Sequence, residues 1–143
     1  MIIGFDHMSF TVTDITKSVD FWTKALGFET AFVAPRSGDW PAKVTGVPGA
    51  QLLVAHLNGH GEKIEFIQYL QGAVLAPLPQ PSMATAAHVC LKVDNLDSTW
   101  QSLLDAGATT QGEITNVREG CRAAYIRDPN GIIIELLELR SRQ

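Results

Sequence analysis

Four side chains suited to binding a metal occupy matching places in the two halves of the chain. His7 and His88 each fall in the first strand predicted for a half, and Glu65 and Glu135 each fall in the last. Imidazoles and carboxylates are common ligands of divalent ions, and two carboxylates balance a double positive charge. A lone histidine on a strand is more often structural, but four such residues in matching places indicate a shared site. The sequence therefore predicts a divalent-metal site formed by His7, Glu65, His88 and Glu135.

Glu135 has the most unusual surroundings of the four. The sequence Asp128-Pro129-Asn130-Gly131 is typical of a tight turn, because Pro fixes φ and both Asn and Gly tolerate positive φ. Three isoleucines and two leucines flank Glu135 in the strand predicted to follow this turn. A carboxylate in so apolar a run needs a cation, a hydrogen-bonding partner or a raised pKa.

The first half contains the elements needed to position such ligands. Residues 5–12 alternate polar and apolar side chains, which predicts a strand with His7 on its polar face. Asp14 offers an N-cap for a helix with one apolar stripe, which ends at Gly27. Residues 28–34, 51–57 and 63–70 are predicted strands, residues 58–61 a hairpin turn, and residues 35–41, rich in Pro and Gly, a loop outside the sheet.

The second half repeats this pattern. Residues 88–93 predict a strand that begins with His88, and Asp94 or Asn95 can cap a helix that ends at Gly107. Strands are predicted near residues 109–115, 122–127 and 132–139. Residues 71–86, rich in Pro, Gln, Ala and Ser, are interpreted as a linker or as a loop that covers another part of the protein. We therefore expect one domain, residues 1–143, made of two modules at about residues 1–70 and 87–143, related by a pseudo-twofold axis.

Composition limits the function classes. A chain of 143 residues that is 45% hydrophobic can bury a core without needing a metal or disulfide to fold. A net charge of −4 and the lack of basic runs argue against nucleic-acid or membrane partners and favour a small molecule. With neither a signal-peptide pattern nor a long apolar stretch, the sequence predicts a cytoplasmic protein.

Several other residues are interpreted as less informative. Cys90 and Cys121 lack metal-ligand spacing and are predicted to be free thiols. His60 lies in the predicted hairpin turn and His56 shortly before it, so both are interpreted as solvated. Trp40, in the predicted loop, is a candidate lid over a substrate, with an ordinary surface position as the alternative.

Larger motifs resemble one known group of proteins. They are Asp6-His7-Met8-Ser9-Phe10-Thr11-Val12, Ser18-Val19-Asp20-Phe21-Trp22, Leu26-Gly27-Phe28, Asp128-Pro129-Asn130-Gly131 and Ile134-Glu135-Leu136. Together they resemble the vicinal oxygen chelate superfamily, which contains glyoxalase I, methylmalonyl-CoA epimerase, extradiol dioxygenases and the fosfomycin and bleomycin resistance proteins. The resemblance implies an α+β fold of two βαβββ modules, whose curved mixed sheets form a cleft around one divalent ion, and a homodimer.

The ligand set narrows what the resemblance implies. Fosfomycin-resistance and extradiol members use two His and one Glu. With the additional Glu65, the ligand set resembles that of glyoxalase I, and nearly that of the epimerases, in which this position is typically Gln. Thr11 stands where bacterial glyoxalase I usually has an arginine, and Gln51 stands where the epimerases have an acid–base glutamate. We therefore expect a metal-dependent lyase or isomerase in which Glu135 or Glu65 transfers a proton. Ni, Co, Zn, Mn and Fe all remain open, and the alternatives are an extradiol-type dioxygenase and a non-catalytic drug or metabolite binder.

Overall fold

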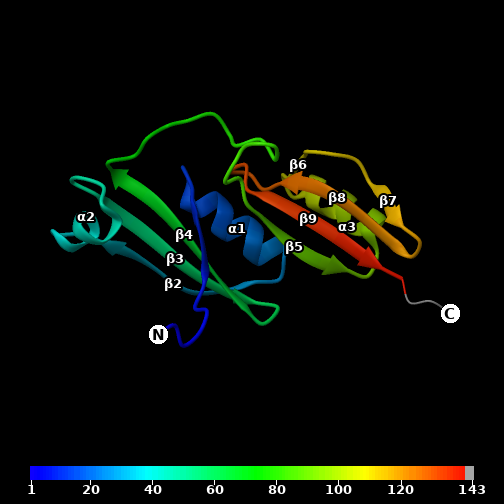
Figure 1. The fold of residues 1–143 in the computed structure, drawn as a ribbon, viewed down its shortest axis with the longest axis horizontal. Helices are drawn as coiled ribbons and strands as arrows, with labels where there is room; N and C mark the ends of the chain where they lie inside the picture. Colours follow the sequence, from blue (N-terminus) through cyan, green and yellow to red (C-terminus); the bar gives the residue numbers. More distant parts are fainter. Residues whose placement is uncertain (141–143) are drawn as a thin grey trace. The chain divides into compact units, whose positions relative to one another are not determined.

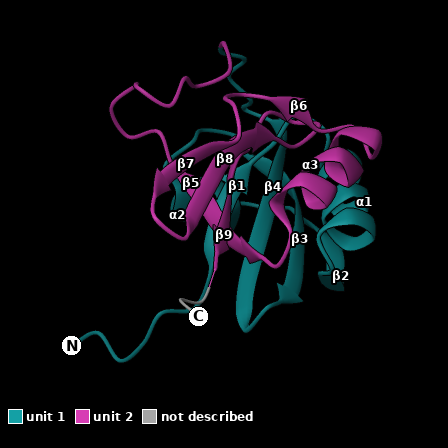
Figure 2. Cartoon of the chain, turned by 90° about the vertical axis from the view of Figure 1, so that its right-hand side faces the viewer, with its two compact units in different colours: residues 1–76 teal, residues 77–143 magenta. Residues whose placement is uncertain are grey.

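A computed structural model describes residues 1–140 of the chain, which divides into two compact units, residues 1–76 and 77–143 (Figure 2). Each unit is a curved mixed sheet whose first strand is followed by the main helix of that unit. Three further strands complete the sheet in unit 1, where a short second helix precedes the third strand, and four further strands complete it in unit 2. The predicted α+β fold of two βαβββ modules is therefore confirmed. No helix among residues 1–140 is long and apolar enough to span a bilayer.

Unit 1 contains a four-stranded sheet in the order β1-β4-β3-β2 (Figure 1). Strand β1 pairs parallel with β4, and the other pairings are antiparallel. The predicted hairpin turn is confirmed, with positive φ at His60 and Gly61 as a tight two-residue turn requires. Its elements are β1 (Met8–Thr11), α1 (Ile15–Ala25), β2 (Glu29–Arg36), α2 (Trp40–Thr45), β3 (Gln51–Gly59) and β4 (Glu62–Gln71).

Two predictions for unit 1 were wrong. Strand β2 continues through Pro35 to Arg36, because β2 lies at the sheet edge, where a missing N–H is tolerated. The segment after it was predicted to be only a loop, yet Trp40 begins helix α2. Pro41 occupies the first turn of α2, where proline suits a helix because those N–H groups lack intrahelical partners. Proline thus indicated an element boundary here rather than the lack of regular structure.

The side of the sheet that faces α1 forms the core of unit 1. Trp22 of α1 is fully buried, and its ring lies 5.3 Å from that of Phe66 and 5.1 Å from that of Phe28. Since side chains alternate along a strand, Glu65 points to the opposite face from Phe66. Packing against α1 therefore presents Glu65 on the face of β4 that the helix leaves uncovered.

Unit 2 contains a five-stranded sheet built on the order β5-β9-β8-β6, with β7 also paired to β8. The strand predicted near residues 109–115 is divided into two short strands, so this sheet gains a strand over the one in unit 1. Ile134 and Leu136 are fully buried, which leaves Glu135 on the opposite face of β9. The elements are β5 (His88–Val93), α3 (Leu96–Asp105), β6 (Thr109–Thr110), β7 (Thr115–Arg118), β8 (Cys121–Arg127) and β9 (Ile133–Leu139).

The two helices begin in the same way. Asp14 caps α1 and Asn95 caps α3, each through a side-chain oxygen that accepts an N–H of the first turn. A second acceptor comes from the last strand of each unit. In unit 1 the amide oxygen of Gln68 accepts the N–H of Ile15 at 2.9 Å, and in unit 2 the carboxylate of Glu138 accepts the N–H of Leu96 at 2.7 Å.

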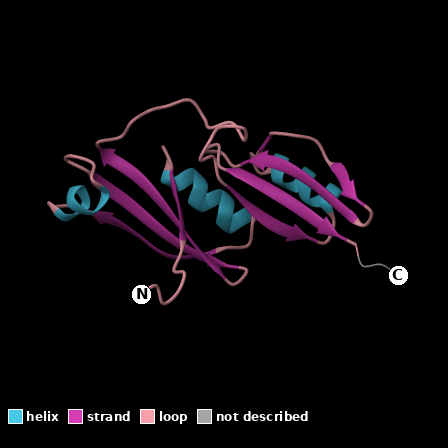
Figure 3. Cartoon of the chain, in the orientation of Figure 1, coloured by secondary structure: helices cyan, strands magenta, loops and turns pink. Residues whose placement is uncertain are grey.

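The turn before β9 is held by Asp128 and Arg127. The Asp128 carboxylate accepts the N–H groups of Asn130 and Ile132, both at 2.9 Å, and Gly131 has a φ of +89°. Residues 72–87 contain neither helix nor strand (Figure 3). Pro79 from this segment accepts a hydrogen bond from the Arg127 guanidinium at 2.8 Å. The later part of the predicted linker is therefore packed against the turn that precedes Glu135.

Candidate metal centre

His7 and Glu65 lie side by side in unit 1. Strand β1 begins at Met8, so His7 immediately precedes the strand in which it was predicted. The parallel pairing places Ser9 opposite Glu65, and His7 Nε2 lies 3.3 Å from Glu65 Oε1. The Glu65 side chain is 15% exposed and that of His7 is 31% exposed, so the pair is sheltered but open to a ligand.

The hydrogen bond between His7 and Asp6 determines which nitrogen of His7 is free. His7 Nδ1 lies 2.7 Å from Asp6 Oδ1, and because a carboxylate only accepts, Nδ1 carries the hydrogen. Lys63 Nζ also donates to both oxygens of Asp6, at 2.9 and 3.0 Å. These hydrogen bonds, that from His7 foremost, lower the pKa of Asp6 to about 2. Such a carboxylate behind an imidazole is the usual arrangement that orients a metal-binding histidine.

This arrangement suits a cation between His7 and Glu65. With Nδ1 protonated, the neutral imidazole directs the lone pair of Nε2 toward a carboxylate oxygen 3.3 Å away. Two acceptor atoms that face each other repel unless a positive charge lies between them, and either a proton on Nε2 or a bound divalent ion supplies it. Both atoms are ordinary ligands of divalent ions. The residues of unit 1 therefore fit the predicted metal.

His56 is a third member of this cluster, and the interpretation of it as a solvated residue was wrong. It lies within β3 directly opposite Glu65, and its Nε2 is 2.8 Å from Glu65 Oε2. Burial alone would raise the pKa of Glu65, but hydrogen bonds from His56 and Ser9 and the nearby imidazoles lower it below its usual value. The sequence of β3 could have indicated this contact, because His56 lies among the buried residues Val54, Ala55 and Leu57 rather than in the turn.

His60 is exposed, as predicted, but it also makes contacts within unit 1. Its Nε2 donates to the carbonyl oxygen of Leu26 at 2.7 Å, and its ring packs edge-on against Phe28 at 5.2 Å. His60 therefore ties the β3–β4 turn to the end of α1. This role is structural, and it has no connection with Glu65.

His88 and Glu135 form the corresponding pair in unit 2. His88 Nε2 lies 3.0 Å from Glu135 Oε2, and the side chains are 38% and 22% exposed. Tyr125, opposite Glu135 in β8, places its hydroxyl 3.4 Å from His88 Nε2. Cys90, opposite Glu135 in β5, hydrogen-bonds to the carboxylate, and burial together with the charge of Glu135 raises the pKa of the Cys90 thiol.

The four predicted ligands thus occur as two pairs, one in each unit. Among residues 1–140, no group of three or more His, Cys, Asp or Glu side chains is arranged as a metal site. Each pair brings one imidazole nitrogen close to one carboxylate oxygen, at 3.3 Å in unit 1 and 3.0 Å in unit 2. A centre that combines the two pairs stays a prediction.

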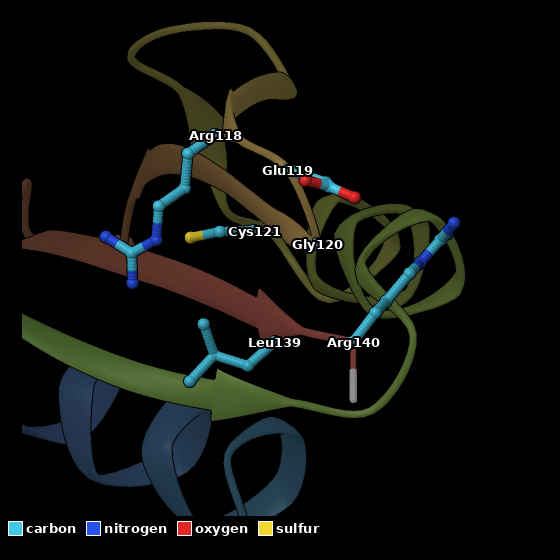
Figure 4. A pocket seen from close by; sticks show the side chains of 6 residues that line it. All are labelled: Arg118, Glu119, Gly120, Cys121, Leu139 and Arg140. Atoms are coloured by element: carbon cyan, nitrogen blue, oxygen red, sulfur yellow. The ribbon is translucent and has the colours of Figure 1, made fainter. Parts of the chain in front are cut away.

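A separate hollow of about 360 Å³ lies in unit 2 beside the β7–β8 turn and the end of β9 (Figure 4). Cys121 and Leu139 line it between Arg118 and Arg140. Cys121 is a free, buried thiol, as predicted, and Cys90 is also free. The hollow contains none of the His–Glu contacts, so it does not coincide with the candidate metal centre.

Trp40 lies 48% exposed at the start of α2. Its role as a lid stays a prediction. Trp100 is half-buried in α3, whereas Trp22 in α1 is fully buried.

Comparison with known proteins identifies relatives of the whole chain. The model of the Glyoxalase/Bleomycin resistance protein/Dioxygenase superfamily matches residues 4–136. A 2-epi-5-epi-valiolone epimerase from Actinomyces is 26% identical over 146 aligned residues, which cover 96% of this chain and 80% of that protein. A glyoxalase family protein from Bacillus cereus has a similar structure, with a TM-score of 0.84 and 23% identity over 99% of this chain and 97% of that one.

A fosfomycin resistance protein, FosX, from Listeria monocytogenes has the same fold. A single-site mutant of that protein, in complex with Mn(II) and 1S,2S-dihydroxypropylphosphonic acid, aligns with a TM-score of 0.64 and 16% identity, covering 99% of this chain and 93% of that one.

Proposed function

Because the chain belongs to the Glyoxalase/Bleomycin resistance protein/Dioxygenase superfamily, we propose that it is a divalent-metal-dependent lyase or isomerase. It transfers a proton within a small substrate that carries vicinal oxygens. The metal ligands are His7, Glu65, His88 and Glu135. The observation that carries the proposal is the matched pair of His–Glu contacts, one in each unit, at 3.3 and 3.0 Å.

Two carboxylates favour proton transfer over oxygen chemistry. Four protein ligands leave two positions on an octahedral ion, and a substrate that binds through two oxygens fills both. Molecular oxygen would then have no free coordination position on the ion, whereas proton transfer does not require one. The relative from Actinomyces is named as an epimerase, and inversion at a carbon that bears hydrogen proceeds by removing and returning a proton.

The two glutamates take different roles in this proposal. Glu65 is held by His56 at 2.8 Å and by Ser9, so it serves as a fixed ligand. Glu135 has one imidazole contact, at 3.0 Å, and the weak donor Cys90, so fewer strong hydrogen bonds hold its carboxylate. We assign Glu135 as the base that takes a proton from the carbon beside the substrate carbonyl and returns it to that carbon or its neighbour.

The remaining groups hold these residues in place. A divalent ion held by these four residues would polarise the substrate carbonyl and stabilise the negative charge that develops on its oxygen. Asp6 keeps the hydrogen of His7 on Nδ1, and Tyr125 contacts His88 Nε2 at 3.4 Å. Nickel, cobalt, zinc, manganese and iron all fit a site of two nitrogens and two carboxylates.

The test begins with metal analysis of protein purified without added metal, followed by titration with each of the five ions. Each loaded form is then offered 2-hydroxyketones, α-keto hemithioacetals, acyl-CoA esters and catechols. We expect one ion per pair of modules and exchange of a substrate hydrogen with solvent deuterium, followed by NMR, without uptake at an oxygen electrode. Oxygen uptake with catechol cleavage would replace this proposal with a dioxygenase. Failure to bind any ion would favour a non-catalytic binder.

The proposal includes a homodimer in the cytoplasm. Met1, Ile2, Ile3 and Phe5 are all at least 77% exposed, which leaves apolar surface at the N-terminus for a second copy to cover. Light scattering on the metal-loaded sample measures the mass directly, and a mass of 15.5 kDa at micromolar concentration would contradict the dimer.

A further inference from the structure

His56 is placed to control the carboxylate of Glu65. The two residues are directly paired across β3 and β4, and His56 Nε2 is 2.8 Å from Glu65 Oε2. The ring of His56 packs against Phe32 of β2 with 4.4 Å between centroids and lies 5.4 Å from the ring of His7. With only 20% of its side chain exposed, His56 is confined by these neighbours.

The two carboxylate oxygens of Glu65 have different neighbours. The carboxylate can only accept, so His56 donates through Nε2–H to Oε2. Oε1 is the oxygen that faces His7 Nε2, at 3.3 Å. The hydrogen on Nε2 also removes the lone pair with which His56 itself would bind an ion.

We propose that His56 is a positioning residue, which holds Oε2 of Glu65 so that Oε1 alone is presented to the ion beside His7. This inference rests on the proposed function, because it gives Glu65 a single-oxygen bond to the ion. A monodentate Glu65 keeps two positions of an octahedral ion open for the substrate, whereas a carboxylate that binds through both oxygens takes one of them. His56 therefore preserves the substrate's access to the metal.

A purely structural role explains the contact less well. Strands β3 and β4 are already joined by a backbone ladder over their whole length, and apolar side chains at the same place would stabilise the sheet at least as well as a half-buried polar pair. The corresponding position in unit 2 holds Tyr125, whose hydroxyl contacts His88 rather than Glu135. Of the two carboxylates, Glu65 is thus the one that receives a donor from the middle strand of its sheet.

Two substitutions of the same residue test the proposal. His56→Leu removes the donor, while His56→Gln keeps an N–H that can reach Oε2. His60→Gln is the matched control, because His60 lies in the same hairpin but contacts Leu26 and Phe28 instead of Glu65. Binding of Mn(II) is measured by electron paramagnetic resonance, the absorption spectrum of Co(II)-loaded protein reports coordination, and thermal unfolding of metal-free protein reports stability.

We expect His56→Leu to weaken Mn(II) binding by about 10- to 100-fold, the usual cost of losing a group that orients a metal ligand. It should also change the Co(II) spectrum, whereas His56→Gln should restore both. His60→Gln should lower stability without changing metal affinity. Unchanged Mn(II) binding in His56→Leu would overturn the proposal. Equal loss in the Leu and Gln variants would overturn it too, in favour of direct coordination by His56. A wild-type protein that binds no ion would instead defeat the proposed function.

Discussion

Units 1 and 2 place their His–Glu pairs at the same positions of the same fold, but they surround them differently. In unit 1 Asp6 supports His7, and both His56 and Ser9 donate to Glu65. In unit 2 the residue before His88 is Ala87, which has no carboxylate to correspond to Asp6. Cys90 occupies the position that corresponds to Ser9.

This difference is the reason for proposing separate roles for Glu65 and Glu135. A carboxylate that accepts several hydrogen bonds is a good fixed ligand but a poor base, because those hydrogen bonds stabilise its charged form. Glu135 has one imidazole contact and the weak thiol donor of Cys90, and we therefore propose it, rather than Glu65, as the base. The fold thus repeats, while the hydrogen bonds around each carboxylate differ, and the proposed function assigns metal binding to Glu65 and proton transfer to Glu135.

Exchanging each glutamate for glutamine should show the largest effect of this division. We expect Glu135→Gln to lower hydrogen exchange by about 100- to 10,000-fold even at saturating metal, because an amide cannot act as the base. Glu65→Gln should mainly weaken metal binding, since the amide oxygen can still act as a ligand, and excess metal should restore most of the exchange. The measurement is deuterium incorporation by NMR alongside a metal titration. Equal loss in both variants at saturating metal would show that the two glutamates share the chemistry.

Asp6→Asn tests the support behind His7, which unit 2 lacks. The asparagine can no longer hold the hydrogen of His7 on Nδ1 as firmly, so we expect metal affinity to fall by about 10- to 100-fold. Asp97→Asn is the matched control, because it breaks the exposed ion pair with Arg122 in unit 2, whose shortest contact is 2.8 Å, and touches neither His–Glu pair. Competition with a metal chelator measures both affinities. If the Asp6→Asn and Asp97→Asn variants bound metal with equal affinity, the role of Asp6 would be limited to its ion pair with Lys63.

The sequence was sufficient to predict the repeat and the strands that carry Glu65, His88 and Glu135, whereas His7 lies one residue before its strand. Alternation and turn chemistry act locally, so they identified the hairpin at His60-Gly61 and the cap at Asp14. The contact between His56 and Glu65 was missed because it depends on how β3 and β4 pair, and proximity to a turn suggested solvent instead. The continuation of β2 through Pro35 was missed because edge position is a property of the whole sheet.

The smallest effect concerns the start of each main helix. Glu138 in unit 2 and Gln68 in unit 1 accept equivalent N–H groups, but only Glu138 can be charged. The hydrogen bond from Leu96, followed by that from Arg140, lowers the pKa of Glu138 below its usual 4.5. Since the folded pKa is lowered, ionised Glu138 contributes stability above about pH 4.5, and this contribution is lost as the pH falls through the folded pKa.

Glu138→Gln should therefore make unit 2 resemble unit 1. We expect slightly lower stability at neutral pH, because the charge-assisted hydrogen bonds are lost, and a shallower loss of stability below pH 4.5, because glutamine has no proton to bind. Gln68→Glu is the reciprocal variant, and it should not reproduce the stabilisation that Arg140 and Arg122 give Glu138, because those arginines belong to unit 2. Thermal unfolding from pH 3 to 7, with a chelator present to remove any contribution from metal binding, measures all three proteins. If wild type and Glu138→Gln lost stability with the same slope below pH 4.5, the charge of Glu138 would have no part in holding α3, and the two helices would begin in energetically equivalent ways.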